Sequence, residues 1–135
     1  MSTETEILKL RTVAIVGLSP DPERPSNKVA GYLQRHGYRI IPVNPGVREI
    51  LGEASYPDLI SIPEPVDTVD IFRRAEFVPA IVEEAIRIKA KAVWMQEGII
   101  NKAAAGRARE AGLLVVMDRC MAVALSELQQ KQGKA

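Results

Sequence analysis

The chain has 135 residues, of which 47% are hydrophobic and 26% charged, and its formal net charge is +1. This length and composition are typical of a single globular domain that buries a core of its own. The balanced charge excludes the strongly basic surface that attracts nucleic acid or anionic membranes over a distance. We therefore expect one domain over residues 1–135, with neither nucleic acid nor a membrane as a partner.

Cys120 is the one cysteine of the chain and His36 is its one histidine. A disulfide within the chain is therefore excluded, and neither residue has further metal ligands at a suitable spacing. A single histidine also gives no recognisable catalytic pair or triad. No apolar run approaches the roughly 20 residues of a membrane span, and residues 1–11 show no signal-peptide pattern. We expect a cytoplasmic protein without a metal site and without catalytic residues.

Short apolar runs alternate with helical patterns along the chain, which predicts a parallel sheet with helices on both faces. A short leading helix is expected over residues 3–10. The expected strands cover residues 12–16, 38–43, 68–72, 92–96 and 113–117, and the expected longer helices cover residues 26–36, 78–90, 101–111 and 121–130.

Several local signals set the expected ends of these elements. Ser26 is expected to cap the first long helix, and Gly37 is expected to end it. Pro42 lacks the N–H that a strand donates, so it marks the end of the second strand. The proline-rich stretch that follows is expected to hold a short helical turn near Asp58–Ser61. Residues 132–135 are expected to fray.

Five parallel strands joined by right-handed crossovers predict an open, doubly wound sheet. In the usual order 3-2-1-4-5, the direction of winding changes between the first and the fourth strand. Ligands bind at that point, outside the carboxyl ends of the strands. The segments that follow the strands there are residues 17–27, 42–46, 71–74 and 96–100.

The loop after the first strand carries groups suited to a phosphate. Gly17 allows a tight turn and a close approach to a ligand, and the start of the next helix favours an anion. Ser19 and Ser26 offer hydroxyl groups, and Arg24 offers a guanidinium that can grip phosphate. The alternative is that Gly17 only makes the turn and Ser26 only caps the helix.

The next two segments argue against an ordinary dinucleotide site. The loop has one glycine where the NAD fingerprint has three, and Val43-Asn44-Pro45 lacks the acidic residue that binds ribose. This apolar strand end suits an adenine or an aliphatic chain, or it is a rigid turn without a ligand. Phe72 beside Arg73 can stack a base and hold a phosphate, or it belongs to the core beside solvated arginines.

Taken together, these motifs resemble the small CoA-binding proteins, whose domain is related to the CoA-binding domain of the succinyl-CoA synthetase α subunit. The resemblance covers about residues 7–128. The motifs that carry it are Val16-Gly17-Leu18-Ser19 with Arg24 and Ser26, Pro42-Val43-Asn44-Pro45, Val69-Asp70-Ile71-Phe72-Arg73, Val93-Trp94-Met95-Gln96-Glu97-Gly98 and Val116-Met117-Asp118-Arg119-Cys120.

The resemblance implies a three-layer, Rossmann-like α/β fold that holds coenzyme A. It implies that Gly17, Leu18, Ser19, Arg24 and Ser26 surround the phosphates, that Val43, Asn44 and Pro45 line the side of the nucleotide, and that Ile71, Phe72 and Arg73 flank it. The synthetase subunit bears a phosphorylated histidine in a second domain, which His36 does not match. Ligase activity is therefore not implied.

The leading hypothesis is a stand-alone protein that binds CoA or acyl-CoA and has no catalysis of its own. The first alternative is an NAD(P)-dependent oxidoreductase, against which the missing glycines and the missing acidic residue count. The second alternative is an interaction domain that has kept the fold and lost the ligand.

Overall fold

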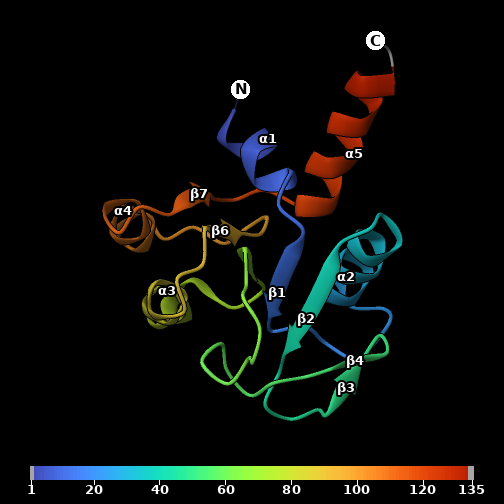
Figure 1. The fold of residues 1–135 in the computed structure, drawn as a ribbon, viewed down its shortest axis with the longest axis horizontal. Coiled ribbons are helices and arrows are strands. Elements are labelled where there is room, and N and C mark those ends of the chain that lie inside the picture. Colours follow the sequence, from blue (N-terminus) through green and yellow to red (C-terminus); the bar gives the residue numbers. More distant parts are fainter. Residues whose placement is uncertain (1, 134–135) are drawn as a thin grey trace.

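The computed structural model describes residues 2–133, which form a parallel five-stranded sheet with helices on both faces (Figure 1). The Rossmann-like α/β fold expected from the sequence is confirmed. The elements are α1 (Thr3–Leu8), β1 (Thr12–Val16), α2 (Pro25–Arg35), β2 (Arg39–Val43), β3 (Glu49–Ile50), β4 (Glu53–Ala54), β5 (Thr68–Ile71), the 3-10 helix η1 (Ala75–Phe77), α3 (Val78–Arg87), β6 (Ala92–Met95), α4 (Lys102–Glu110), β7 (Leu114–Val116) and α5 (Met121–Gly133).

The order of the strands differs from the expected one. The sheet runs β2-β1-β5-β6-β7, so β5 pairs with β1 instead of lying beyond β2. Pro42 gives the physical reason: its carbonyl faces the outer edge of β2, where it accepts a hydrogen bond from the Tyr56 N–H at 3.1 Å. Since proline has no N–H to offer there, this edge suits a short bridge better than a full strand. The winding therefore changes direction between β1 and β5.

Side chains alternate between the two faces of the sheet, and each face has its own core. Ala14 and Val16 of β1 pack toward α3 and α4, whereas Val13 and Ile15 pack toward α1, α2 and α5. All four residues of β5 are buried, as its central position requires. Both layers are visible in Figure 1 as helices on either side of the strands. The carboxyl ends of the strands therefore meet at one edge of the molecule.

Three local expectations need correction. Ser26 does not cap α2, because the helix begins at Pro25 with Arg24 in the capping position and Ser26 in the first turn. The end of β2 at Val43, directly after Pro42, is the expected one. The segment Asp58–Ser61 makes a hydrogen-bonded turn without a helix, closed by the Asp58 carboxylate, which accepts from the Ser61 N–H at 2.8 Å.

The last correction concerns the carboxyl-terminal residues. Helix α5 continues to Gly133, so the fraying expected from residue 132 is absent up to that point, while residues 134–135 lie outside the described residues. Gly37 does end α2, with a φ of +90°. None of the helices between residues 2 and 133 is both long and apolar enough to span a bilayer.

Candidate functional site

Gly17 draws together the ends of three neighbouring strands. It follows β1 with a φ of +87°, and its N–H donates to the Val43 carbonyl at 3.0 Å. A Cβ at this position would lie 2.5 Å from the carbonyl oxygen of Phe72, which is closer than such atoms approach. Only glycine combines this backbone conformation with this contact. Gly17 therefore does more than turn the chain, because it sets the spacing between β1 and β5 at the point where the winding changes.

Three polar side chains form hydrogen bonds with the backbone of the loop after Gly17. The Ser26 hydroxyl accepts a hydrogen bond from the Ser19 N–H at 3.0 Å, and the Asn27 amide donates to the Ser19 carbonyl at 2.9 Å. The Asn44 amide donates to the Leu18 carbonyl at 2.9 Å, and its oxygen accepts from the Gly46 N–H. These contacts fix the shape of the loop that precedes α2.

Replacing Asn44 with alanine is expected to lower the free energy of unfolding by about 1–2 kcal/mol, because the Leu18 carbonyl loses its donor. Urea denaturation of both proteins measures the difference. Ser55→Ala is the matched control, since the Ser55 hydroxyl donates to the Asn44 carbonyl and not to the loop. Equal effects of the two substitutions would contradict a specific role of Asn44 in anchoring the loop.

A row of adjoining cavities follows the carboxyl ends of the strands. One of about 270 Å³ is lined by Gly17, Ser19, Arg24, Pro25, Ser26 and Phe72. It shares Pro25 and Phe72 with a cleft of about 750 Å³, which is also lined by Val29, Arg73, Arg74, Ala75, Gln96, Glu97, Gly98, Ile99 and Cys120. The cleft shares Glu97 and Cys120 with a third cavity, of about 310 Å³, whose other lining residues are Asp118, Arg119 and Val123. We call these the loop pocket, the central cleft and the far pocket, and together the groove.

A smaller hollow of about 110 Å³ lies on the β2 side of the groove. Val43, Pro45 and Arg73 line it, and Arg73 also lines the central cleft. The structure thus brings most of the predicted site residues to one edge. Leu18, Ile71 and Asn44 are the exceptions, and the side chains of Leu18 and Ile71 are fully buried in the core. Asn44 lines none of these cavities and contacts the underside of the loop.

The predicted set omitted the lining residues that come from β6 and the start of α5. Gln96 is almost fully buried, and its side-chain oxygen accepts from the Met121 N–H at 3.1 Å at the start of α5. Cys120 is half-buried beside it and lines the central cleft. One sequence signal could have identified Gln96 and Glu97 as lining residues, because both follow directly after a buried apolar strand.

Positive charge lies at the loop pocket and along one wall of the central cleft. The Arg24 side chain is exposed and has no ion-pair partner within residues 2–133. The Arg73 guanidinium lies 4.3 Å from the centre of the Phe77 ring, and exposed Arg74 pairs with Glu76 at 3.5 Å. An exposed pair of this kind is worth little. These arginines are thus available to an anion that reaches the groove.

Asp70 is a buried carboxyl group in the middle of β5, between Ile15 of β1 and Trp94 of β6. It is inaccessible to solvent, and neither carboxylate oxygen has a hydrogen-bond partner among residues 2–133. Burial raises the pKa of this carboxyl group well above its usual value, and the nearby Ile71 amide acts in the opposite direction. The hydroxyl of Thr68, on the same face of β5, also lacks a partner in that part of the chain.

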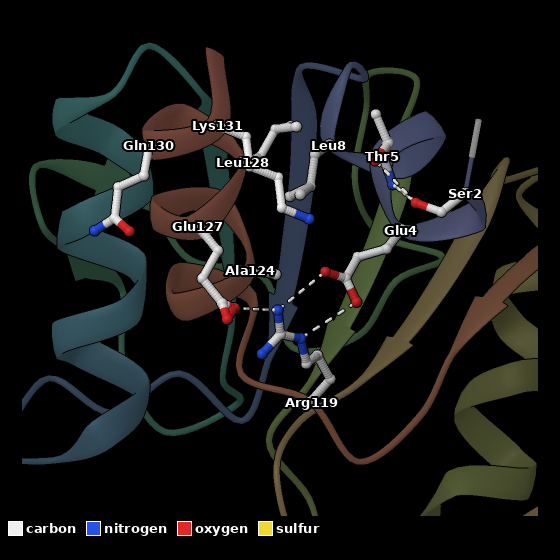
Figure 2. A pocket seen from close by; sticks show the side chains of 10 residues that line it. All are labelled: Ser2, Glu4, Thr5, Leu8, Arg119, Ala124, Glu127, Leu128, Gln130 and Lys131. Carbon is white, nitrogen blue, oxygen red and sulfur yellow. Dashed lines mark hydrogen bonds and ion pairs between the residues drawn. The ribbon is translucent and has the colours of Figure 1, made fainter. Parts of the chain in front are cut away.

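A separate hollow of about 400 Å³ lies between α1 and α5 (Figure 2). The Arg119 guanidinium occupies it and binds Glu4 of α1 at 3.1 Å and Glu127 of α5 at 2.7 Å. The hydrogen bonds that Arg119 donates to Glu4 and, second in importance, to Glu127 raise the pKa of Arg119. Two carboxylates thus compensate the charge of Arg119, which therefore adds little positive field to the groove beside it.

Comparisons with known proteins show the family to which the chain is similar. The family described as the CoA binding domain matches residues 11–126. YneT from Bacillus subtilis (strain 168) is 42% identical over 120 residues, which cover 88% of this chain and 89% of YneT. The structure of a protein from Pyrococcus horikoshii OT3 is similar with a TM-score of 0.90 and 39% identity, covering 96% of this chain and 93% of that chain.

One relative is a much longer protein. Acetate–CoA ligase (ADP-forming) I from Archaeoglobus fulgidus is 34% identical over 110 residues, which cover 81% of this chain but 16% of the ligase. The similarity is thus confined to one part of that ligase. The resemblance to CoA-binding proteins that the motifs suggested is confirmed, and the chain belongs to the CoA-binding domain family.

Proposed function

We propose that this chain binds CoA or acyl-CoA in the groove and has no catalysis of its own. The observation that carries the proposal is the order of the cavities, in which the loop pocket with Gly17 and Arg24 opens into the longer central cleft. CoA has a matching order, with anionic phosphates followed by a long, uncharged arm that ends in a thiol. The phosphates would lie at the loop and at the start of α2, where backbone N–H groups and the helix dipole favour anions.

The same proposal gives roles to the predicted site residues. Gly17, Ser19 and Arg24 would lie against the phosphates, and Phe72 and Arg73 would flank the nucleotide. Val43 and Pro45 would contact the nucleotide from the β2 side, where they line a common hollow. Leu18 and Ile71 would contribute only backbone, because their side chains are buried. Ser26 and Asn44 would act mainly through the loop that they hold.

The NAD(P) alternative is disfavoured by the end of β2. An NAD site places an acidic side chain there to bind the ribose hydroxyls, whereas Asn44 already gives its side-chain amide to the Leu18 carbonyl. Catalysis by His36 is disfavoured too, because this residue follows α2 at the opposite edge of the sheet. Its ring stacks on Tyr32 and lies 3.1 Å from the Gln129 amide nitrogen.

Isothermal titration calorimetry tests the proposal directly. The purified chain is titrated with CoA, acetyl-CoA, NAD and NADP under the same buffer and salt conditions. We expect CoA and acetyl-CoA to bind, and NAD and NADP to bind at least about tenfold more weakly. Preference for NAD or NADP would overturn the proposal. The absence of binding to all four ligands would support an interaction domain that has lost the ligand.

Replacing Arg24 with alanine is expected to weaken CoA binding by about 5- to 150-fold, or about 1–3 kcal/mol, because a charged hydrogen bond to phosphate is lost. Calorimetry of both proteins measures the difference. Arg109→Ala is the matched control, since Arg109 is exposed in the last turn of α4, which lies away from the groove. An unchanged affinity of the Arg24 variant would remove this residue from the site.

A further inference from the structure

The two ends of the groove differ in charge. Of the described residues, the loop pocket has Arg24 and no acidic residue in its lining. The far pocket has Glu97 and Asp118 in its lining, and Arg119 is the one cation that residues 2–133 contribute to it. Figure 2 shows that the Arg119 guanidinium points between α1 and α5, where Glu4 and Glu127 bind it. The far pocket therefore has two acidic side chains and little compensating positive charge.

The acidic side chains of the far pocket occupy defined places. The Asp118 carboxylate accepts a hydrogen bond from the Gly98 N–H at 2.7 Å, which joins the loop after β7 to the loop after β6. Glu97 precedes Gly98, so the same hydrogen bond holds its backbone next to Asp118. The Asp118 backbone has a φ of +59°, a conformation that aspartate adopts more readily than most residues. Glu97 and Asp118 thus line the far pocket together with Cys120.

The order of the cavities relates this end to the ligand. The far pocket adjoins the central cleft at Glu97 and Cys120, and the central cleft adjoins the loop pocket at Pro25 and Phe72. If the phosphates of CoA occupy the loop pocket, as proposed above, the arm crosses the central cleft and its sulfur end points to the far pocket. An acyl group on that sulfur would extend toward Glu97 and Asp118.

From this arrangement we infer that the groove selects CoA and thioesters of uncharged acyl groups, and rejects acyl groups that end in a carboxylate. The residues responsible are Glu97 and Asp118, which repel a second negative charge at that end. The inference rests on the proposed function, because it requires the phosphates to lie at the loop. Rejection by like charge is an effective source of specificity, since the wrong ligand loses binding energy without any gain for the right one.

The experiment compares butyryl-CoA with succinyl-CoA, which have acyl chains of four carbons and differ by a terminal carboxylate. We expect succinyl-CoA to bind the unaltered chain at least about tenfold more weakly than butyryl-CoA in calorimetric titrations at low salt. In the double variant Glu97→Gln with Asp118→Asn, the ratio of the dissociation constants of succinyl-CoA and butyryl-CoA should fall to about threefold or less. The amide introduced by Asp118→Asn keeps an oxygen that can accept from the Gly98 N–H, so the loop should stay in place.

Two further variants keep the result interpretable. Glu97→Gln alone changes an exposed side chain without a hydrogen bond in the described part of the chain, so it should fold normally and lower the ratio in part. Glu49→Gln, on the hairpin beyond β2, should leave the ratio unchanged. Equal binding of the two thioesters to the unaltered chain would overturn the inference and leave the proposed function intact. A ratio that persists in the double variant would overturn the assignment to these two residues, and no binding of free CoA would overturn the proposed function itself.

Discussion

The substitution Gly17→Ala is expected to lower the free energy of unfolding by about 3 kcal/mol, the largest loss from a single methyl group in the groove. Two costs add at this position. A φ of +87° costs an alanine roughly 1 kcal/mol, and its Cβ would lie 2.5 Å from the Phe72 carbonyl oxygen, an overpacking that costs about 1–3 kcal/mol. The carbonyl belongs to backbone that leaves β5, so it has little room to move.

Gly112→Ala separates the two costs. Gly112 has a φ of +91°, and a Cβ there would meet nothing within 4 Å. Its substitution should therefore lower stability by about 1 kcal/mol only, through backbone strain alone. Urea denaturation of both variants gives the difference that belongs to the contact with Phe72. Equal losses would show that the close approach of β1 and β5 carries no energetic weight.

The elements of the fold could be predicted because their signals are local. The run Thr12–Val16 is short, apolar and β-branched, and the observed strand has the expected bounds. Helices α3 and α4 begin and end within a few residues of their expected positions, since proline, asparagine and glycine mark their ends. In each case, residues close together in the sequence determine the outcome.

The order of the strands could not be predicted in the same way, because it depends on contacts between distant segments. Both the expected and the observed order bury five apolar strands between two layers of helices. The choice depends on the outer edge of β2, where Tyr56 pairs with Pro42 and Asn44. The hairpin of β3 and β4, which leads the chain to this position, has two residues in each strand and gave no recognisable pattern.

The convergence of the site segments could be predicted more readily than the contacts of each side chain. Strand ends converge in any parallel sheet, so the predicted segments meet at one edge even with the wrong strand order. The role of each side chain depends on its partners in space. Ser26 and Asn44 form hydrogen bonds with the loop backbone, and Arg119 forms ion pairs with Glu4 of α1 and Glu127 of α5.

Replacing Asp70 with asparagine is expected to make the protein more stable at pH 8, relative to the unaltered chain, than it does at pH 4. The Asp70 carboxyl group is fully buried without a hydrogen-bond partner in residues 2–133, so its ionised form is strongly disfavoured. Asparagine has the same shape and remains neutral at every pH. Urea denaturation of both proteins between pH 4 and pH 8 measures the effect, with Asp67→Asn as the control for an aspartate in the same segment.

The sign of the pH dependence distinguishes the two aspartates. Burial raises the pKa of Asp70 in the folded state, so the folded protein binds a proton more tightly than the unfolded chain. The stability of the unaltered protein should therefore fall relative to Asp70→Asn as the pH rises above about 4, by up to about 1.4 kcal/mol per pH unit. For Asp67, burial acts in the same direction, but the Thr12 and Arg11 amides and Lys91 outweigh it and lower the pKa. The unaltered protein should thus be more stable than Asp67→Asn at neutral pH and lose this advantage as the pH falls. A pH-independent difference between the unaltered protein and Asp70→Asn would show that a neighbouring group satisfies the buried carboxylate.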